Sequence, residues 1–223
     1  MSALIRYQFE LLLRSQRWLP PFLGYALVLG IGVAGDQPMM DCHAYAAALL
    51  IPVTAWYVRC ALTADPPPAR ACLVAATGPV RVYLASLAAA LGAGLLLALV
   101  EVGVIWLVCG RTTIRPGYEV SWPHAALAGL LAAVCCVLIG VLVGVLSHRP
   151  VLLRGSYGIL AALGLSVLVW VVPVSPANRA VRALVAGSQR VHVYYPLLAP
   201  VAAALLLAAV VAGTAVLARR RTE

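Results

Sequence analysis

The chain has 223 residues, of which 64% are hydrophobic and only 10% are charged, and its mean hydropathy is +1.00. This composition excludes a water-soluble globular protein, and apolar stretches of about 20 residues recur, the length needed to cross a hydrocarbon core of roughly 30 Å. The net charge of +9 comes from 16 Arg and no Lys. Because these Arg lie at the ends of apolar runs, they indicate membrane topology rather than a nucleic-acid surface.

Residues 1–17 predict an amphipathic helix that lies in the membrane interface rather than crossing it. At helical spacing the charged side chains share one narrow face and apolar side chains cover the rest. A secretory signal segment is the alternative, and the two consecutive prolines that follow disfavour it. The side chains of the polar face are Arg6, Glu10, Arg14 and Arg17.

Six apolar segments follow, and they predict an all-α, polytopic membrane protein with one domain over residues 1–223. When the loops are assigned to alternate sides, 11 of the 16 Arg fall on one side and five on the other. The positive-inside rule therefore predicts that both termini are cytoplasmic. The membrane expected for this protein is the cytoplasmic (inner) membrane. The predicted spans are residues 18–35, 44–62, 82–109, 125–146, 156–174 and 197–218.

Residues 65–81, between the second and third spans, predict a short helix on the cytoplasmic side. Asp65 is expected as its N-cap and Pro66 at its first position, and Gly78 is expected just past its end. A helix of roughly ten residues is too short to cross a bilayer. It therefore offers a surface that a soluble partner can bind.

Residues 175–195, before the last span, are half apolar and lack clusters of turn residues. This composition favours one or two short helices at, or dipping into, the outer interface. An ordinary surface loop is the alternative.

This order of elements resembles the membrane subunit of type-two ABC exporters. The resemblance covers nearly the whole chain and rests on architecture rather than on a signature sequence. It implies a permease that forms a homo- or heterodimer and docks cytosolic ATPase subunits, which bind ATP and Mg. It also implies that the helix at 65–81 is the coupling helix received by the ATPase. The residues expected to make that contact are Asp65, Pro66, Arg70, Leu73 and Val74.

The expected substrate is a hydrophobic or amphipathic compound such as a lipid, a peptide or an antibiotic. Tyr25, Trp56 and Tyr57 are expected to line its path. Glu101 is the one acidic residue inside a predicted span, and it is either a polar contact on the path or a structural residue. The alternative function is a membrane scaffold or immunity protein that docks a cytosolic partner without transporting anything.

The motifs of catalysis are absent from the sequence. Without Lys there is no G-x-x-x-x-G-K-[ST] loop, and neither H-E-x-x-H nor G-x-S-x-G occurs. The chain is therefore not expected to be an enzyme. ATP hydrolysis is assigned to the separate ATPase subunit.

Two residue pairs predict contacts between helices. Gly140 and Gly144 form a small-x-x-x-small pair that allows two helices to approach closely. Cys42 and Cys109 both lie near the predicted outer face, where a disulfide between them is an option. The run Asp41-Cys42-His43, interpreted as part of a loop, has no second ligand cluster, so no metal site is predicted.

Overall fold

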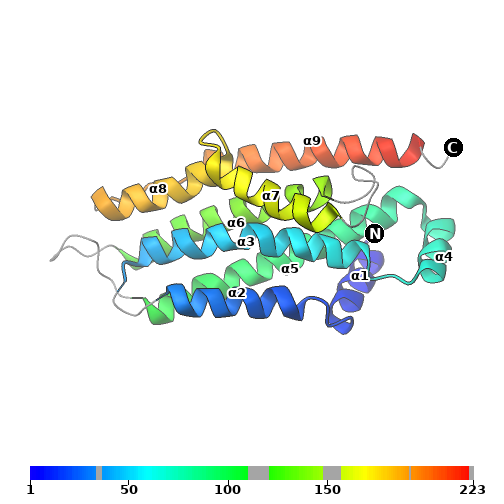
Figure 1. Ribbon diagram of the computed structural model, residues 1–223, viewed down its shortest axis with the longest axis horizontal. Helices are drawn as coiled ribbons and strands as arrows, with labels where there is room; N and C mark the ends of the chain where they lie inside the picture. Colours follow the sequence, from blue (N-terminus) through cyan, green and yellow to red (C-terminus); the bar gives the residue numbers. More distant parts are fainter. Residues whose placement is uncertain (34–36, 110–120, 148–156, 191, 221–223) are drawn as a thin grey trace.

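The computed structural model describes residues 1–33, 37–109, 121–147, 157–190 and 192–220, and every regular element within these ranges is a helix (Figure 1). The all-α prediction is confirmed. The helices are α1 (Ser2–Arg14), α2 (Leu19–Gly32), α3 (Met39–Leu62), α4 (Pro67–Thr77), α5 (Pro79–Val108), α6 (Trp122–Leu146), α7 (Tyr157–Val171), α8 (Pro176–Arg190) and α9 (Leu198–Arg220).

The long helices run side by side in one elongated bundle (Figure 1). Helix α1 crosses one end of this bundle, and α4 lies beyond the same end. The C-terminal end of α9 lies there too, so the two ends of the described chain and α4 share one end of the molecule.

Several helices are long and apolar enough to cross a membrane, which indicates a membrane-embedded protein. In the described part of the chain, α3, α5, α6 and residues 198–215 of α9 meet this criterion. Helices α7 and α8 meet it together, although they are bent by 49° where they join. Helix α2 is apolar but has only 14 residues. The structure thus supplies four or five spans by length, and the sixth span stays a prediction.

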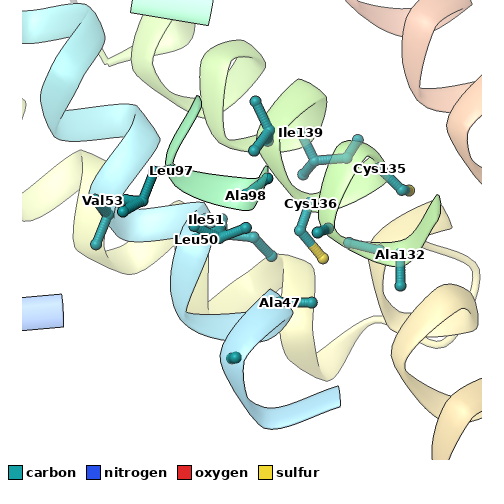
Figure 2. Close-up of a cluster of buried hydrophobic side chains, with 14 of the residues drawn as sticks. Ala47, Leu50, Ile51, Val53, Leu97, Ala98, Ala132, Cys135, Cys136 and Ile139 are labelled. Carbon is teal, nitrogen blue, oxygen red and sulfur yellow. The ribbon is translucent and has the colours of Figure 1, made fainter. Parts of the chain in front are cut away.

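Helix α3 is the centre of the bundle, and it packs against α1, α2, α5, α6, α7 and α8. Its closest neighbour is α6, and the buried side chains between them are mostly small or β-branched (Figure 2). Gly140 and Gly144 of α6 lie on this contact. A Cβ on Gly140 would lie 2.7 Å from Ile51 O, and one on Gly144 would lie 3.0 Å from Ala55 O. These glycines therefore let the two backbones approach closely.

Helix α3 begins at Met39, five residues before the predicted start of the second span at residue 44. The interpretation of Asp41-Cys42-His43 as part of a loop is therefore wrong, because all three residues belong to the first turns of the helix. Pro38 immediately precedes the helix, and the carboxylate in its first turn favours the positive end of the helix dipole. This correction places His43 inside the bundle.

Helix α4 confirms the short helix between the second and third spans but shifts its start. The prediction of Asp65 as N-cap and Pro66 as first helical residue is wrong, since Pro66 occupies the cap position and Pro67 begins the helix. Gly78 ends it as predicted, with φ of 88°, a conformation that glycine adopts without strain. Helix α5 starts directly after that glycine.

Helix α8 confirms a helix within residues 175–195, so the alternative of an ordinary loop is wrong. Its small-residue face, which includes Ala177, Ala180 and Gly187, is buried against α3 and α6. Asn178 donates its side-chain amide to Trp170 O, which satisfies a carbonyl at the break between α7 and α8. The exposed face of α8 carries Arg179, Arg182 and Arg190.

Candidate functional site

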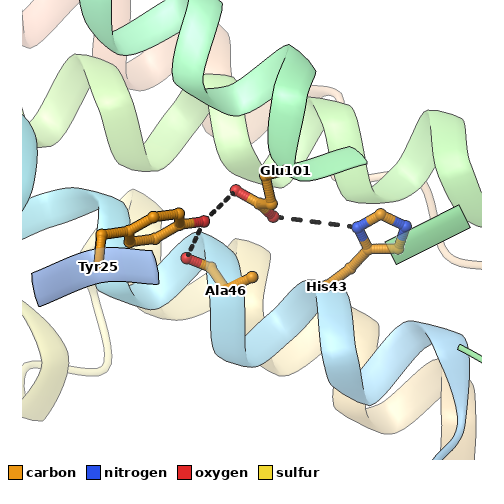
Figure 3. Close-up of polar contacts among 4 residues, drawn as sticks. All are labelled: Tyr25, His43, Ala46 and Glu101. Atoms are coloured by element: carbon orange, nitrogen blue, oxygen red, sulfur yellow. Dashed lines mark hydrogen bonds and ion pairs between the residues drawn. The ribbon is translucent and has the colours of Figure 1, made fainter. Parts of the chain in front are cut away.

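Three polar side chains from different helices meet inside the bundle. Tyr25 of α2, His43 of α3 and Glu101 of α5 point toward one another (Figure 3). The Tyr25 hydroxyl donates to Glu101 Oε2 at 3.0 Å and lies 3.5 Å from Ala46 O. The exposed fractions of the three side chains are 4%, 0% and 1% in that order. Polar groups are costly in the membrane-embedded part of a protein, so this cluster is the first candidate for a functional site.

The hydrogen bonding of this cluster is incomplete. Glu101 Oε1 lies 4.0 Å from His43 Nδ1, which is too long for a hydrogen bond. Within the described residues, Glu101 Oε1 and both ring nitrogens of His43 lack a hydrogen-bond partner. Gly129 of α6 closes the other side of the imidazole, because a Cβ there would lie 2.6 Å from His43 Nδ1. A buried polar atom without a partner costs about 1–3 kcal/mol, so the cluster has unused capacity to bind a proton or another polar group.

A groove between α2 and α5 leads to this cluster. Its outer part encloses about 810 Å³ of empty space, some of it open to the outside, and of the described residues on its wall only Tyr25 and Glu101 have polar side chains. An inner part adjoins it, sharing Phe22, Leu97 and Val100, and reaches α1. The backbones of α2 and α5 do not pack against each other, so in the described residues the Tyr25–Glu101 hydrogen bond is the polar link across the groove.

The four residues predicted to line a substrate path are only partly brought together. Tyr25 and Glu101 meet directly, and Tyr57 lies on the wall of the inner part of the same groove. Trp56 faces elsewhere, toward a small pocket between α3 and α7. The predicted set therefore does not share a single cavity.

Asp65 lies in the segment that connects α3 to α4, and its side chain faces α1. It is buried and accepts a hydrogen bond from Gln8 Nε2 at 2.8 Å and another from the Tyr7 hydroxyl at 3.4 Å. Both donors belong to α1. Partial burial and the Asp65 carboxylate raise the pKa of Tyr7 above its ordinary value. Asp65 therefore holds α1 against the end of α3, and it is not displayed to a soluble partner.

The other residues predicted for the ATPase contact differ in exposure. Arg70 is half-buried and donates from Nη1 to Leu62 O at 2.6 Å, which ties α4 to the last turn of α3. Leu73 and Val74 are also half-buried, whereas Pro66 is exposed. The outward face of α4 consists of small, uncharged side chains at helical spacing, a set that the sequence prediction missed: Pro68, Ala71, Cys72, Ala75 and Ala76.

Cys42 and Cys109 are neighbours at the far end of the bundle from α4. Both are buried free thiols, and the Cys42 thiol donates to Gln37 Oε1 at 3.9 Å. The disulfide between them stays a prediction. Among the described residues, no three His, Cys, Asp or Glu side chains form a group that could hold a metal ion.

His43 is the member of the cluster that sequence reasoning missed. The sequence does carry a signal for it: Pro38 is followed three positions later by Asp41, a pattern typical of a helix start. A helix beginning there places His43 one turn inside the bundle. In comparisons with known proteins, no family model, curated protein or solved structure matches this chain.

Proposed function

We propose that this chain is the permease subunit of an ATP-driven ABC exporter in the cytoplasmic membrane. In this proposal α2, α3, α5, α6, the bent α7–α8 pair and α9 provide six crossings, and α1 lies in the cytoplasmic interface. Both termini face the cytoplasm. A second permease copy completes the path for a hydrophobic or amphipathic substrate, and separate ATPase subunits bind ATP and Mg.

The observation that carries this proposal is the surface of α4. This helix has no fully buried residue, although it is 11 residues long. Its outward face is uncharged and made of small side chains spaced three and four residues apart. Such a face suits insertion into a groove on a partner protein, because small side chains let the partner approach closely and no charged side chain has to lose its hydration.

The attachments of α4 suggest how a force on it reaches the bundle. Arg70 ties it to the last turn of α3, and the single residue Gly78 joins it to α5. Helices α3 and α5 carry His43 and Glu101 of the buried cluster. A partner that pulls on α4 would therefore act on the two helices that position these side chains.

Cys72 provides a test that needs no substitution. It lies on the outward face of α4, and it is the one exposed cysteine of the six in the chain. We expect a membrane-impermeant maleimide to modify Cys72 in inside-out vesicles but not in right-side-out vesicles. We also expect a co-purifying soluble ATPase to slow this reaction several-fold, and its removal by washing to restore the rate.

A matched control is a Cys72→Ser protein with Gln189→Cys, which moves the reactive thiol to the exposed face of α8. In detergent, where both sides of the protein are accessible, its modification should be insensitive to the ATPase. If Cys72 reacts equally fast with and without every soluble protein that co-purifies, or if none of these carries an ATP-binding loop, the permease proposal is wrong. The scaffold or immunity function would then take its place.

A further inference from the structure

The groove between α2 and α5 has the chemistry of a binding site for one class of ligand. Among the described residues that line it, all are apolar except Tyr25 and Glu101, and none is an arginine or a second acid. Its cavity volume of about 360 Å³ lies at the lower end of the range of pockets for drug-sized molecules. An apolar body could occupy this groove, but a carboxylate ligand would meet Glu101 without a cation to pair with.

Glu101 is the group that selects the charge of the ligand. Its Oε1 atom is buried and has no hydrogen-bond partner in the described chain, and its Oε2 atom is held only by Tyr25. Among the described residues, the nearest basic side chain is His43, at 4.0 Å and beyond hydrogen-bond distance. A carboxylate in such surroundings is strongly stabilised by a cation that enters with its own apolar covering.

From these observations we infer that the α2–α5 groove binds hydrophobic organic cations. The positive group of the cation lies next to the Glu101 carboxylate, and its apolar body packs against α2 and α5. This inference rests on the proposed function, for which it names the substrate class. Tyr25 lies beside Glu101 on the wall and donates to its Oε2 atom, so the Tyr25 hydroxyl must release Oε2 when the cation binds there. Among the described helices the backbone of α2 packs against α3 alone, so a small displacement of α2 suffices to open this contact.

The test uses the full-length protein, purified without any ATPase, with radiolabelled tetraphenylphosphonium as the probe. We expect saturable binding that unlabelled tetraphenylphosphonium displaces and that triphenylphosphine oxide, a neutral molecule of similar shape, does not. Glu101→Gln keeps the size of the side chain but removes its charge, and it should weaken binding about ten- to a hundredfold. Asp41→Asn is the matched control, since Asp41 is also partly buried but bonds to Ser188 away from the groove, and its affinity should be unchanged.

A second measurement on the unsubstituted protein protects the test against misfolding of the Gln variant. A hydrophobic carbodiimide should modify Glu101, as detected by peptide mass spectrometry, and saturating tetraphenylphosphonium should slow this modification. The inference is overturned if Glu101→Gln binds the cation as tightly as the original protein, if the neutral analogue competes equally, or if the carbodiimide never reaches Glu101 or is not slowed. None of these results depends on an ATPase, so the substrate class and the permease proposal can fail separately.

Discussion

Gly140 and Gly144 determine how closely α6 approaches α3. At both positions the nearest atoms to an added Cβ include a backbone carbonyl oxygen of α3. A carbonyl oxygen of a helix cannot rotate away as the end of a flexible side chain can. Any larger residue here must push the two helices apart, and the small buried side chains around them would then lose contact.

We predict that Gly140→Ala destabilises the protein by about 1–3 kcal/mol, the usual cost of overpacking a core. Gly144→Ala should have a similar but smaller effect, because its closest carbonyl is 3.0 Å away rather than 2.7 Å. Thermal unfolding in detergent measures both. Gly103→Ala in α5 is the control, since nothing lies within 4 Å of its Cβ position. Equal melting temperatures for all three variants would contradict the assigned packing.

At the scale of elements, α1 packs against α5 through apolar side chains such as the buried Leu12, and polar contacts hold it to the end of α3. Its Gln8 amide is fully buried and donates to Asp65, and Arg17, just after the helix, donates to Thr63 O at 3.0 Å. Asp65 therefore connects two elements that the proposed function places on the cytoplasmic side. A substitution of Asp65 intended to test ATPase coupling would also loosen α1.

We predict that Asp65→Ala leaves the Gln8 amide without its acceptor and weakens the docking of α1 by about 1–3 kcal/mol. Hydrogen exchange of the α1 amides should become faster, while exchange in α6 stays unchanged. Asp65→Asn, which keeps one carbonyl oxygen, should partly restore protection. Glu10→Gln is the control, because Glu10 pairs only with the exposed Arg6 and such pairs contribute little. Faster exchange in the control alone would contradict this account.

The sequence predicted the helices more completely than it predicted the site. Long apolar runs leave few alternatives to membrane helices, so the helical character of all six predicted spans agrees with the structure. His43 was missed because Met39–His43 contains an acid and an imidazole, which lower the apparent hydrophobicity of the first turns of α3. The relevant signal there is the helix start, not the apolar run.

The pairing of side chains lay beyond sequence reasoning. Tyr25 and Glu101 were each singled out, but their contact depends on the register of α2 against α5, which are 76 positions apart at this point. The same limit applies to Asp65. A carboxylate before a proline-rich helix start is typical of an N-cap, and only the placement of α1 shows that its partners are Gln8 and Tyr7.

At the scale of the whole molecule, the helices differ widely in length. Helices α3, α5 and α6 have 24, 30 and 25 residues, whereas α2 has 14 and α7 has 15. At 1.5 Å per residue the two short helices extend only about 21 to 23 Å. The hydrocarbon layer of a typical bilayer is roughly 30 Å thick, so these helices alone cannot match it.

In the proposed arrangement α7 continues into α8 within one crossing, whereas α2 crosses alone. The lipid beside α2 must therefore thin, since each ångström of mismatch costs a fraction of a kcal/mol. We predict a higher melting temperature in dilauroyl than in dioleoyl phosphatidylcholine bilayers; a melting temperature independent of acyl-chain length would contradict this. The long helices can tilt to fit a thin bilayer, but the short ones cannot lengthen to fit a thick one. A ring of compressed lipid along α2 would then be the environment from which molecules dissolved in the membrane enter the neighbouring groove.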